Sequence, residues 1–433
     1  MVQPAPRDGR GPQRHRGPAD RGTLLTANVA DAVADAHRSE WASELASTAR
    51  FTRDLDLAEE CAQDAYTQAL VTWERDGVPA KPGAWLTTVA SNRARDVLRR
   101  QAAFRRRLPL LVADDAATVV GERPAVDDDR LRLVFTCCHP ALSGEAQVAL
   151  TLRLVCGLST AEVARAFLVQ EATMAARITR AKKKIATARI AYRVPSRAEL
   201  PERLAAVLDV VYLVFTTGHA APAGDDLVRR DLVDRALDLG RILDQLLPDE
   251  TGVAGLLALM LLVDARRDSR VGPDGSLVLL ADQDRSRWDR SEIEEGVALL
   301  ARSLARRTPD RYAVEAAIAA VHAEAPTWAE TDWDEVVRLY GVLLGLRPSP
   351  IVALNRAAAI GLRDGPQAGL DALAPLADEP VLATYPYLSA ARADFLRQLG
   401  RMEEARDAYQ EALALTGNEV ERAFLARRLD EVG

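Results

Sequence analysis

Residues 158–185 read LSTAEVARAFLVQEATMAARITRAKKKI, and this stretch gives the clearest indication of the local fold. Ser159 followed three residues later by Glu162 forms a capping box, which predicts that a short helix begins here. After a turn at 168–170, a second helical pattern begins at Glu171. Ala164 is small enough to let the two helices cross closely. The apolar positions that would form their shared buried face are Val163, Met174, Ile178 and Ile185. The stretch therefore predicts a helix-turn-helix.

The second helix of this motif is strongly basic. Residues 177–189 contain six cations and no acid, and three of the four lysines in the whole chain lie here. Each phosphate that such a cation neutralises adds salt-dependent affinity for DNA. A solvated helix face would also be charged, but the charge coincides with helix-turn-helix spacing. The combination favours contact with the DNA major groove.

A second pair of helical patterns lies upstream. Residues 54–66 read DLDLAEECAQDAY and present an acidic face, and residues 85–100 read WLTTVASNRARDVLRR and combine an apolar stripe with a cationic one. The loop between them, residues 76–83, holds two prolines and two glycines, which separates two helices. Trp85 is open to two interpretations, a core side chain or a stacking platform for a base.

The order of these motifs resembles the sigma-70 family of bacterial transcription factors. The acidic helix, the Pro/Gly loop and the Asn-Arg-x-x-Asp-x-x-Arg-Arg pattern of residues 92–100 resemble region 2, and the helix-turn-helix resembles region 4. The absence of other sigma regions before and between them is typical of the extracytoplasmic-function (ECF) type. The phrases FTCCHPA at 135–141 and VALNR at 352–356 are similar to an ECF subgroup with a long C-terminal extension.

The resemblance implies a role for individual residues. The acidic helix would dock on the β′ clamp of core RNA polymerase, region 4 would meet the β flap, and two further sets would bind promoter DNA. Loop 77–83 would receive an unstacked base. Ala175 stands where the family more usually has a polar residue, so the resemblance does not indicate which bases of the −35 element the helix would contact. The expected polymerase-binding residues are Asp54, Glu59, Glu60, Gln63 and Asp64. The expected −10 residues are Asn92, Arg93, Asp96, Arg99 and Arg100, and the expected −35 residues are Thr173, Arg177, Arg180 and Lys182.

Beyond these motifs the chain is helical to its end. A turn with short extended flanks is predicted at 271–280. Ala390, Gly400, Ala405, Tyr409 and Ala412 have the spacing of a tetratricopeptide-like (TPR-like) helix pair, and a looser copy covers 365–373. Such pairs stack into surfaces that bind proteins or peptides. A regulatory protein or peptide is therefore an expected partner of this extension.

Charge separates the two halves of the chain. Residues 1–189 hold 28 Lys and Arg against 23 Asp and Glu, whereas residues 190–433 hold 28 against 40. A basic half joined to an acidic half favours nucleic-acid contact by the first, and it motivates the hypothesis that the second regulates it.

The sequence offers little for other chemistry. The four cysteines include the cluster Cys137-Cys138-His139, for which a buried structural role and a metal or redox role both stand, the first being favoured. We find no phosphate loop, nucleophile elbow or metal-spaced cluster, so no enzyme, catalytic residue, metal or cofactor is expected. The longest apolar run is about half a membrane span, which predicts no membrane contact and a cytoplasmic protein.

We therefore expect an all-α protein with a region 2 helical bundle, a region 4 helix-turn-helix bundle and a C-terminal TPR-like domain. The expected divisions are a flexible basic tail at 1–26, region 2 at 27–103, a linker at 104–126, region 4 at 127–190 and the extension at 191–433. The main alternative is a TPR-bearing helix-turn-helix regulator that acts without core polymerase, but it leaves the region 2 pattern unexplained.

Overall fold

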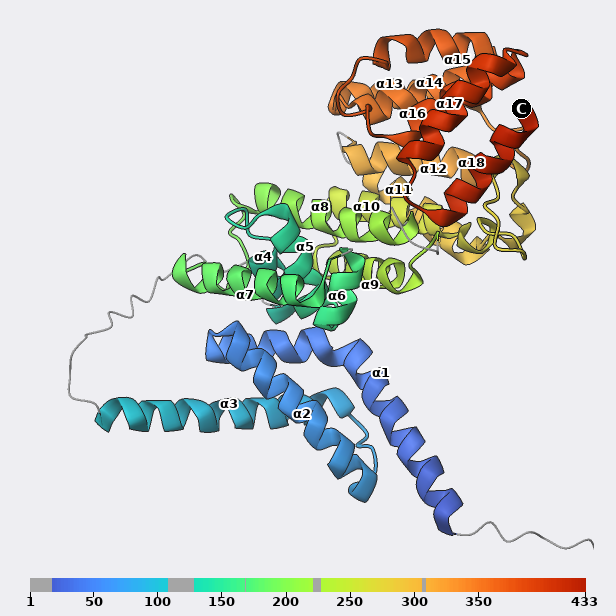
Figure 1. The fold of residues 1–433 in the computed structure, drawn as a ribbon. Coiled ribbons are helices and arrows are strands. Elements are labelled where there is room, and N and C mark those ends of the chain that lie inside the picture. Colours follow the sequence, from blue (N-terminus) through green and yellow to red (C-terminus); the bar gives the residue numbers. More distant parts are fainter. Residues whose placement is uncertain (1–17, 108–127, 168, 221–226, 306–308) are drawn as a thin grey trace, which may run out of the picture. The chain divides into compact units, whose positions relative to one another are not determined.

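The computed structural model describes residues 18–107, 128–167, 169–220, 227–305 and 309–433. Within these ranges every regular element is helical, apart from one isolated β-bridge between Val271 and Leu277 (Figure 1). The chain forms two compact units. The first comprises the described parts of 1–123, 127–137 and 149–194, and the second comprises those of 124–126, 138–148 and 195–433. The expectation of an all-α fold is confirmed.

The first unit is built on three long helices that pack on one another. These are α1 (Pro18–Thr52), α2 (Leu55–Asp76) and α3 (Pro82–Arg107). Helix α1 also packs against α4 (Asp129–Cys137) and the π-helical turn η1 (Thr151–Val155). The remaining helices of this unit are α6 (Thr160–Ala166) and α7 (Glu171–Thr187), and α5 (Gly144–Leu150) spans the boundary between the units.

Local chemistry explains where these helices begin. The Asp54 carboxylate accepts hydrogen bonds from the amides of Asp56 and Leu57, so Asp54 caps α2. Pro82 opens α3, where its fixed φ suits the first helical turn. Ser159 caps α6 and forms the capping box with Glu162 that the sequence predicted.

The second unit holds the helices from α8 onward. They are α8 (Leu200–His219), α9 (Arg230–Leu246), α10 (Thr251–Asp264), α11 (Arg290–Leu304), α12 (Arg311–Glu324), α13 (Trp333–Leu346), α14 (Pro350–Asp364), α15 (Pro366–Leu373), α16 (Pro386–Gln398), α17 (Met402–Leu415) and α18 (Glu419–Val432). Short 3₁₀ turns are η2 (Arg267–Ser269), η3 (Leu280–Asp282), η4 (Arg285–Arg287) and η5 (Ala374–Leu376).

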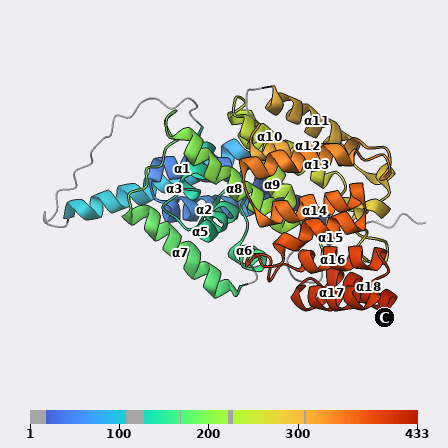
Figure 2. The same cartoon turned by 90° about the horizontal axis from the view of Figure 1, so that it is seen from above.

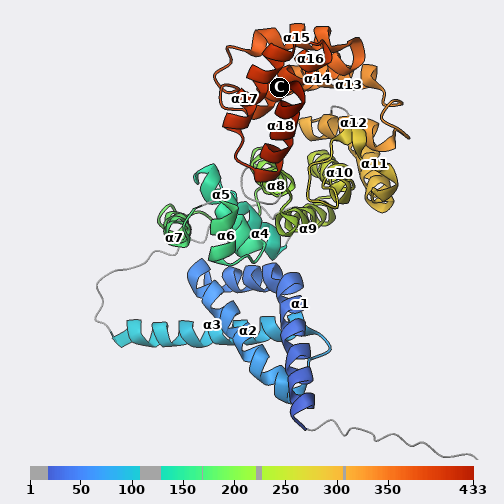
Figure 3. The same ribbon diagram turned by 45° about the vertical axis from the view of Figure 1, so that its right-hand side comes forward.

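Helix α10 lies at the centre of this unit. Residues 253–262 are apolar on every side and all are buried, as expected of a helix that is surrounded by others. Helices α8, α9, α11 and α12 all pack against it (Figure 3). The β-bridge at 271 and 277 closes a turn with Gly275 at φ +80°, which confirms the turn predicted at 271–280.

Helices α13 to α18 follow one another side by side in chain order (Figure 2). In the α16–α17 pair, Ala405, Tyr409 and Ala412 are buried, and Gly400 has φ +74° in the turn between the helices. Gly369 and Gly361 both lie against the Phe395 ring, where a Cβ atom would clash with it. Small residues therefore allow these helices to pack closely.

The structure differs from the expected divisions at three places. Helix α1 begins at Pro18, so the end of the expected tail is helical, while residues 1–17 lie outside the described residues. Helix α3 reaches Arg107 and thus extends into the expected linker, of which 108–126 also lie outside. The region 4 segment is interrupted, because residues 138–148 group with the second unit, and the first unit ends at Val194.

Candidate nucleic-acid interface

Helix α7 presents the residues expected to read the −35 element. Met174, Ile178 and Ile185 are buried, so the opposite face of the helix points outward. Thr173 and Arg180 are exposed on that face. The expected buried face of the helix-turn-helix is confirmed.

Arg177 is held in place by an aromatic ring. Its guanidinium lies over the Phe167 ring at 5.4 Å from the ring centroid, which links α7 to the end of α6. The side chain is half-buried rather than fully exposed. It is therefore preorganised on the face that carries Arg180.

Helix α3 presents the residues expected to lie along the −10 element. Asn92, Arg93, Asp96, Arg99 and Arg100 are all exposed. Asp96 forms an ion pair with Arg99, one turn away, and its carbonyl oxygen accepts from Arg100 Nε at 3.3 Å. These pairs hold the cations in a row along one side of the helix. Trp85 is half-buried and packs edge-on against the buried Trp73, with centroids 5.6 Å apart, which favours the core interpretation.

The acidic residues of α2 do not form one uniform face. Glu60 and Gln63 are exposed, but Asp54 is engaged in capping the helix. Asp64 Oδ2 accepts from Arg93 Nε at 2.8 Å, which joins the expected polymerase-binding set to the expected −10 set. Glu59 is buried.

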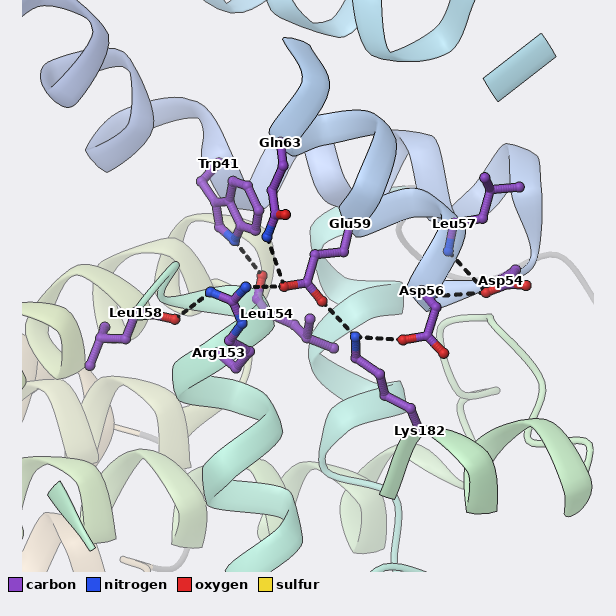
Figure 4. A network of polar contacts seen from close by, with 10 residues as sticks. All are labelled: Trp41, Asp54, Asp56, Leu57, Glu59, Gln63, Arg153, Leu154, Leu158 and Lys182. Carbon is purple, nitrogen blue, oxygen red and sulfur yellow. Dashed lines mark hydrogen bonds and ion pairs between the residues drawn. The ribbon is translucent and has the colours of Figure 1, made fainter. Parts of the chain in front are cut away.

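Glu59 lies in an ion-pair network that joins α2 to the helix-turn-helix (Figure 4). Lys182 Nζ donates to Glu59 Oε2 at 2.5 Å and to Asp56 Oδ1 at 2.8 Å. Arg153 on η1 forms an ion pair with the other oxygen of Glu59 and donates to the Leu158 carbonyl at 2.8 Å. The side chains of Lys182 and Glu59 are only 8% and 9% exposed.

Electrostatics in this network favour the charged lysine. Burial by itself lowers the pKa of Lys182, but the carboxylates of Glu59 and Asp56 outweigh it, and the pKa lies above its ordinary value. Lys182 is thus charged at neutral pH. One residue expected to bind polymerase and one expected to bind DNA neutralise each other in this arrangement.

Neighbouring contacts reinforce the same junction. Trp41 Nε1 on α1 donates to the Leu154 carbonyl at 3.0 Å. Gly157 has φ +73° and lies so close to Trp41 and His37 that a Cβ atom would be 3.0 Å from the indole. Tyr192 donates to the Ala46 carbonyl at 2.9 Å, which ties the chain after α7 back to α1. Glycine is thus required at 157 by both conformation and space.

Sequence reasoning missed Asp56, Arg153 and Trp41 as parts of this junction. Lys182 and its two carboxylate partners are more than 120 residues apart in sequence, and Arg153 lies outside both motifs. No local spacing relates them. Only the burial of a lysine on an otherwise exposed basic helix distinguishes the site.

The cysteines take no part in the interface. All four are buried and none forms a disulfide. Burial, followed by the nearby Glu60 and Asp64 carboxylates, raises the pKa of Cys61 to about 11, which makes its thiolate scarce. Among the described residues no group of three His, Cys, Asp or Glu comes together as a metal site would require.

A helical bundle with an exposed cationic helix and a helix-turn-helix are the features of a DNA-binding protein. Known families agree with this class. Sigma-70 region 2 matches residues 40–104, and sigma-70 region 4 matches residues 132–185. A family of unknown function (DUF6596) matches residues 203–304. The chain belongs to the sigma-70 family, as an ECF-like factor with a C-terminal extension, and this family supplies promoter recognition in transcription initiation without enzymatic chemistry.

The sequence similarity extends over nearly the whole of a relative. An uncharacterized protein of Rhizobium meliloti (strain 1021) is 44% identical over 389 residues, which cover 88% of this chain and 92% of the relative. No solved structure matches the chain. In the part of the chain that the structure describes, no helix is long and apolar enough to cross a membrane.

Proposed function

We propose that this chain binds core RNA polymerase as a sigma factor and directs it to promoters through α3 at the −10 element and α7 at the −35 element. The observation that carries the proposal is the pair of exposed cationic faces, Arg93 to Arg100 on α3 and Thr173 to Arg180 on α7, in modules that match regions 2 and 4. Arginine forks suit both phosphate contact and bidentate contact to guanine. Core polymerase would supply the chemistry of nucleotide addition.

The proposal requires the ion-pair network of Figure 4 to open. Glu59 cannot meet a polymerase surface, and Lys182 cannot meet a phosphate, while each is buried against the other. The described arrangement of the first unit therefore suits the factor before it engages core. Core binding to α2 would compete for Glu59 and release Lys182 toward DNA.

The C-terminal extension would act as a regulatory module. Its excess of acidic residues and its stacked helix pairs support a role in binding a partner or restraining the basic half. A chain that stops after Val194, checked for intact helicity by circular dichroism, tests this role. Transcription equal to that of the full chain under all conditions would exclude it.

In vitro transcription tests the main proposal. The assay combines bacterial core polymerase, the purified chain and a template that carries the region upstream of its own coding sequence. We expect a discrete start site that depends on the chain, and its loss in an Arg177/Arg180 double alanine variant that leaves the buried Lys182 in place. An Arg338→Ala variant on α13 is the control, because Arg338 is exposed and, among the residues that the structure describes, forms its ion pair within its own helix.

A regulator that acts without core polymerase is the competing candidate. It would shift duplex DNA but neither bind core nor initiate transcription with it. The two outcomes are distinguishable in the same set of reactions.

A further inference from the structure

The end of α10 in the second unit carries a concentration of arginines. The segment Asp264-Ala265-Arg266-Arg267-Asp268-Ser269-Arg270 places three of them within five residues, and Arg285 on η4 adds a fourth. Only one of these four is neutralised inside the cluster itself. Arg267 forms ion pairs with Asp264 and, at 2.8 Å, with Asp234.

The other three arginines face no carboxylate at hydrogen-bond distance among the described residues. Arg270 donates to the carbonyl oxygen of His219. Arg285 Nη1 donates to the carbonyls of His322 and Ala325 at 2.6 and 2.8 Å, and its guanidinium lies 4.5 Å from the Trp288 ring centroid. The Arg266 side chain has neither a hydrogen bond nor an ion pair within the described part of the chain.

Polar atoms of the neighbouring side chains are also unpaired. Nδ1 of His219, Nδ1 of His322 and Nη2 of Arg285 are buried, and none has a hydrogen-bond partner in the described structure. His219 is only 8% exposed. An unpaired buried polar group costs free energy, so three together indicate a partner that the chain does not itself supply.

Electrostatic interactions link these groups to one another. Burial, then Arg266 and Arg285, lower the pKa of His322 to about 4. Burial, then Arg270, Arg266 and Arg267, lower the pKa of His219 well below its usual range. Burial and the neighbouring Arg270 lower the pKa of Arg266 to about 10. Arg266 thus lies within reach of both histidines, and the two imidazoles are neutral at pH 7.

The nearby acids are already engaged. Asp264 pairs with Arg267, Glu421 accepts from Tyr387 at 2.6 Å, and Glu315 accepts from Tyr212 at 3.1 Å. Burial raises the pKa of Glu315, which weakens its negative charge further. The positive potential around Arg266 is therefore left without a matching anion.

We propose that the cluster of Arg266, Arg270, Arg285, His219 and His322 binds the oxyanion group of a small ligand, a phosphate or a carboxylate. The planar fork of Arg266 would make two parallel hydrogen bonds to two oxygens, which a lysine could not do. A neutral imidazole with its N–H at Nδ1 would donate to a further oxygen. The site lies within the second unit and is distinct from the faces of α3 and α7.

Thermal unfolding of the full chain tests the site directly. Inorganic phosphate and citrate serve as separate probes, each titrated at constant ionic strength against sodium chloride. We expect a saturable rise in the unfolding temperature with at least one probe, because an anion that binds only the folded state stabilises it. A response to phosphate alone points to a phosphorylated ligand, and a response to citrate points to a carboxylate.

Arg266→Gln is the decisive variant. The substitution should weaken binding of the probe at least tenfold. In chloride alone the variant should unfold at the same or a higher temperature, because the substitution removes an uncompensated cation. Arg266→Lys should keep the charge and lose most of the affinity, whereas the control Arg338→Gln should respond as the unmodified chain does.

Three results would overturn the proposal. They are the absence of a saturable response to either probe, an equal response in Arg266→Gln, and a lower unfolding temperature of Arg266→Gln in chloride, which would make Arg266 a structural residue. None of these readouts depends on transcription, so they are independent of the sigma-factor assay.

Discussion

At the scale of single residues, buried charge is the least expected feature of the first unit. Glu44 on α1 is fully buried, and this desolvation raises the pKa of its carboxyl to about 8. In the unfolded chain the same group has its ordinary value of 4.5. Between these two values the folded chain holds a proton that the unfolded chain releases. The contribution of Glu44 to stability is therefore most favourable below pH 4.5 and is lost as pH rises toward 8.

Replacing Glu44 with glutamine should remove that pH dependence. We expect Glu44→Gln to change stability little near pH 4.5 and to raise it by about 2–4 kcal/mol above pH 8. Urea unfolding at both pH values measures the difference, and the exposed Glu60→Gln is the control. An equal effect of Glu44→Gln at both pH values would show that folding does not shift the pKa of Glu44.

Lys182 offers a second test at this scale. Removing it leaves the buried Glu59 carboxylate with Arg153 and the Gln63 amide but without the lysine charge, so Lys182→Met should cost about 2–3 kcal/mol of stability. Lys183→Met is a matched control on the same helix, because Lys183 is exposed and should change stability by less than about 0.5 kcal/mol. Equal unfolding midpoints for the two variants would show that the buried ion pair does not stabilise the fold.

The helix caps can be read from the sequence, but the ion pairs of buried charged residues cannot. Ser159 and Glu162 are three residues apart, so their capping box could be predicted from local spacing alone. The burial of Lys182 could not be predicted, because its partners depend on how α2 packs against α7. The basic pattern of the helix indicates DNA contact for all of its cations, although Lys182 is buried and pairs with Glu59.

At the scale of elements, α3 and α7 should contribute to DNA binding in different ways. Arg99 and Arg100 are exposed and aligned along α3, as phosphate contacts would be. An Arg99/Arg100 double alanine variant should weaken promoter binding on all sequences and reduce the slope of log affinity against log salt by about 2. Fluorescence anisotropy of the core complex at several salt concentrations measures this slope, and an unchanged slope would remove α3 from the DNA interface.

Arg180 on α7 should instead act on particular bases. An Arg180→Ala variant should lose about 1–3 kcal/mol of promoter affinity, and the loss should disappear on a template with a scrambled −35 element. Equal losses on both templates would make Arg180 a phosphate contact. Lys184→Ala is the comparison on the same helix, because Lys184 is exposed toward the end of α7.

The elements themselves were the most predictable part of the fold. The helical pattern of 85–100, the loop before it and the turn at 271–280 are all confirmed, because helix periodicity and Gly/Pro signals are local. The unit boundaries were less predictable. The grouping of 138–148 with the second unit depends on long-range packing, for which the sequence carries no local signal.

At the scale of the whole molecule, a role as a sigma factor requires the ion-pair network in the first unit to open when the chain binds polymerase. A carbodiimide can join Lys182 to Asp56 directly, because their charged atoms are 2.8 Å apart and Asp56 is 75% exposed. We expect the cross-linked peptide pair in the free chain and its loss when excess core polymerase is present. Mass spectrometry of the digested product measures both states. An undiminished cross-link in the core complex would show that the network stays closed.

Transcription by core RNA polymerase from the region upstream of the coding sequence of this chain is the most direct measurement of sigma-factor activity. We expect a discrete transcript that requires the chain, weakens with Arg180→Ala and is unchanged with Arg338→Ala. A chain that binds duplex DNA but neither binds core nor yields a transcript with it would contradict the assignment of a sigma-factor role.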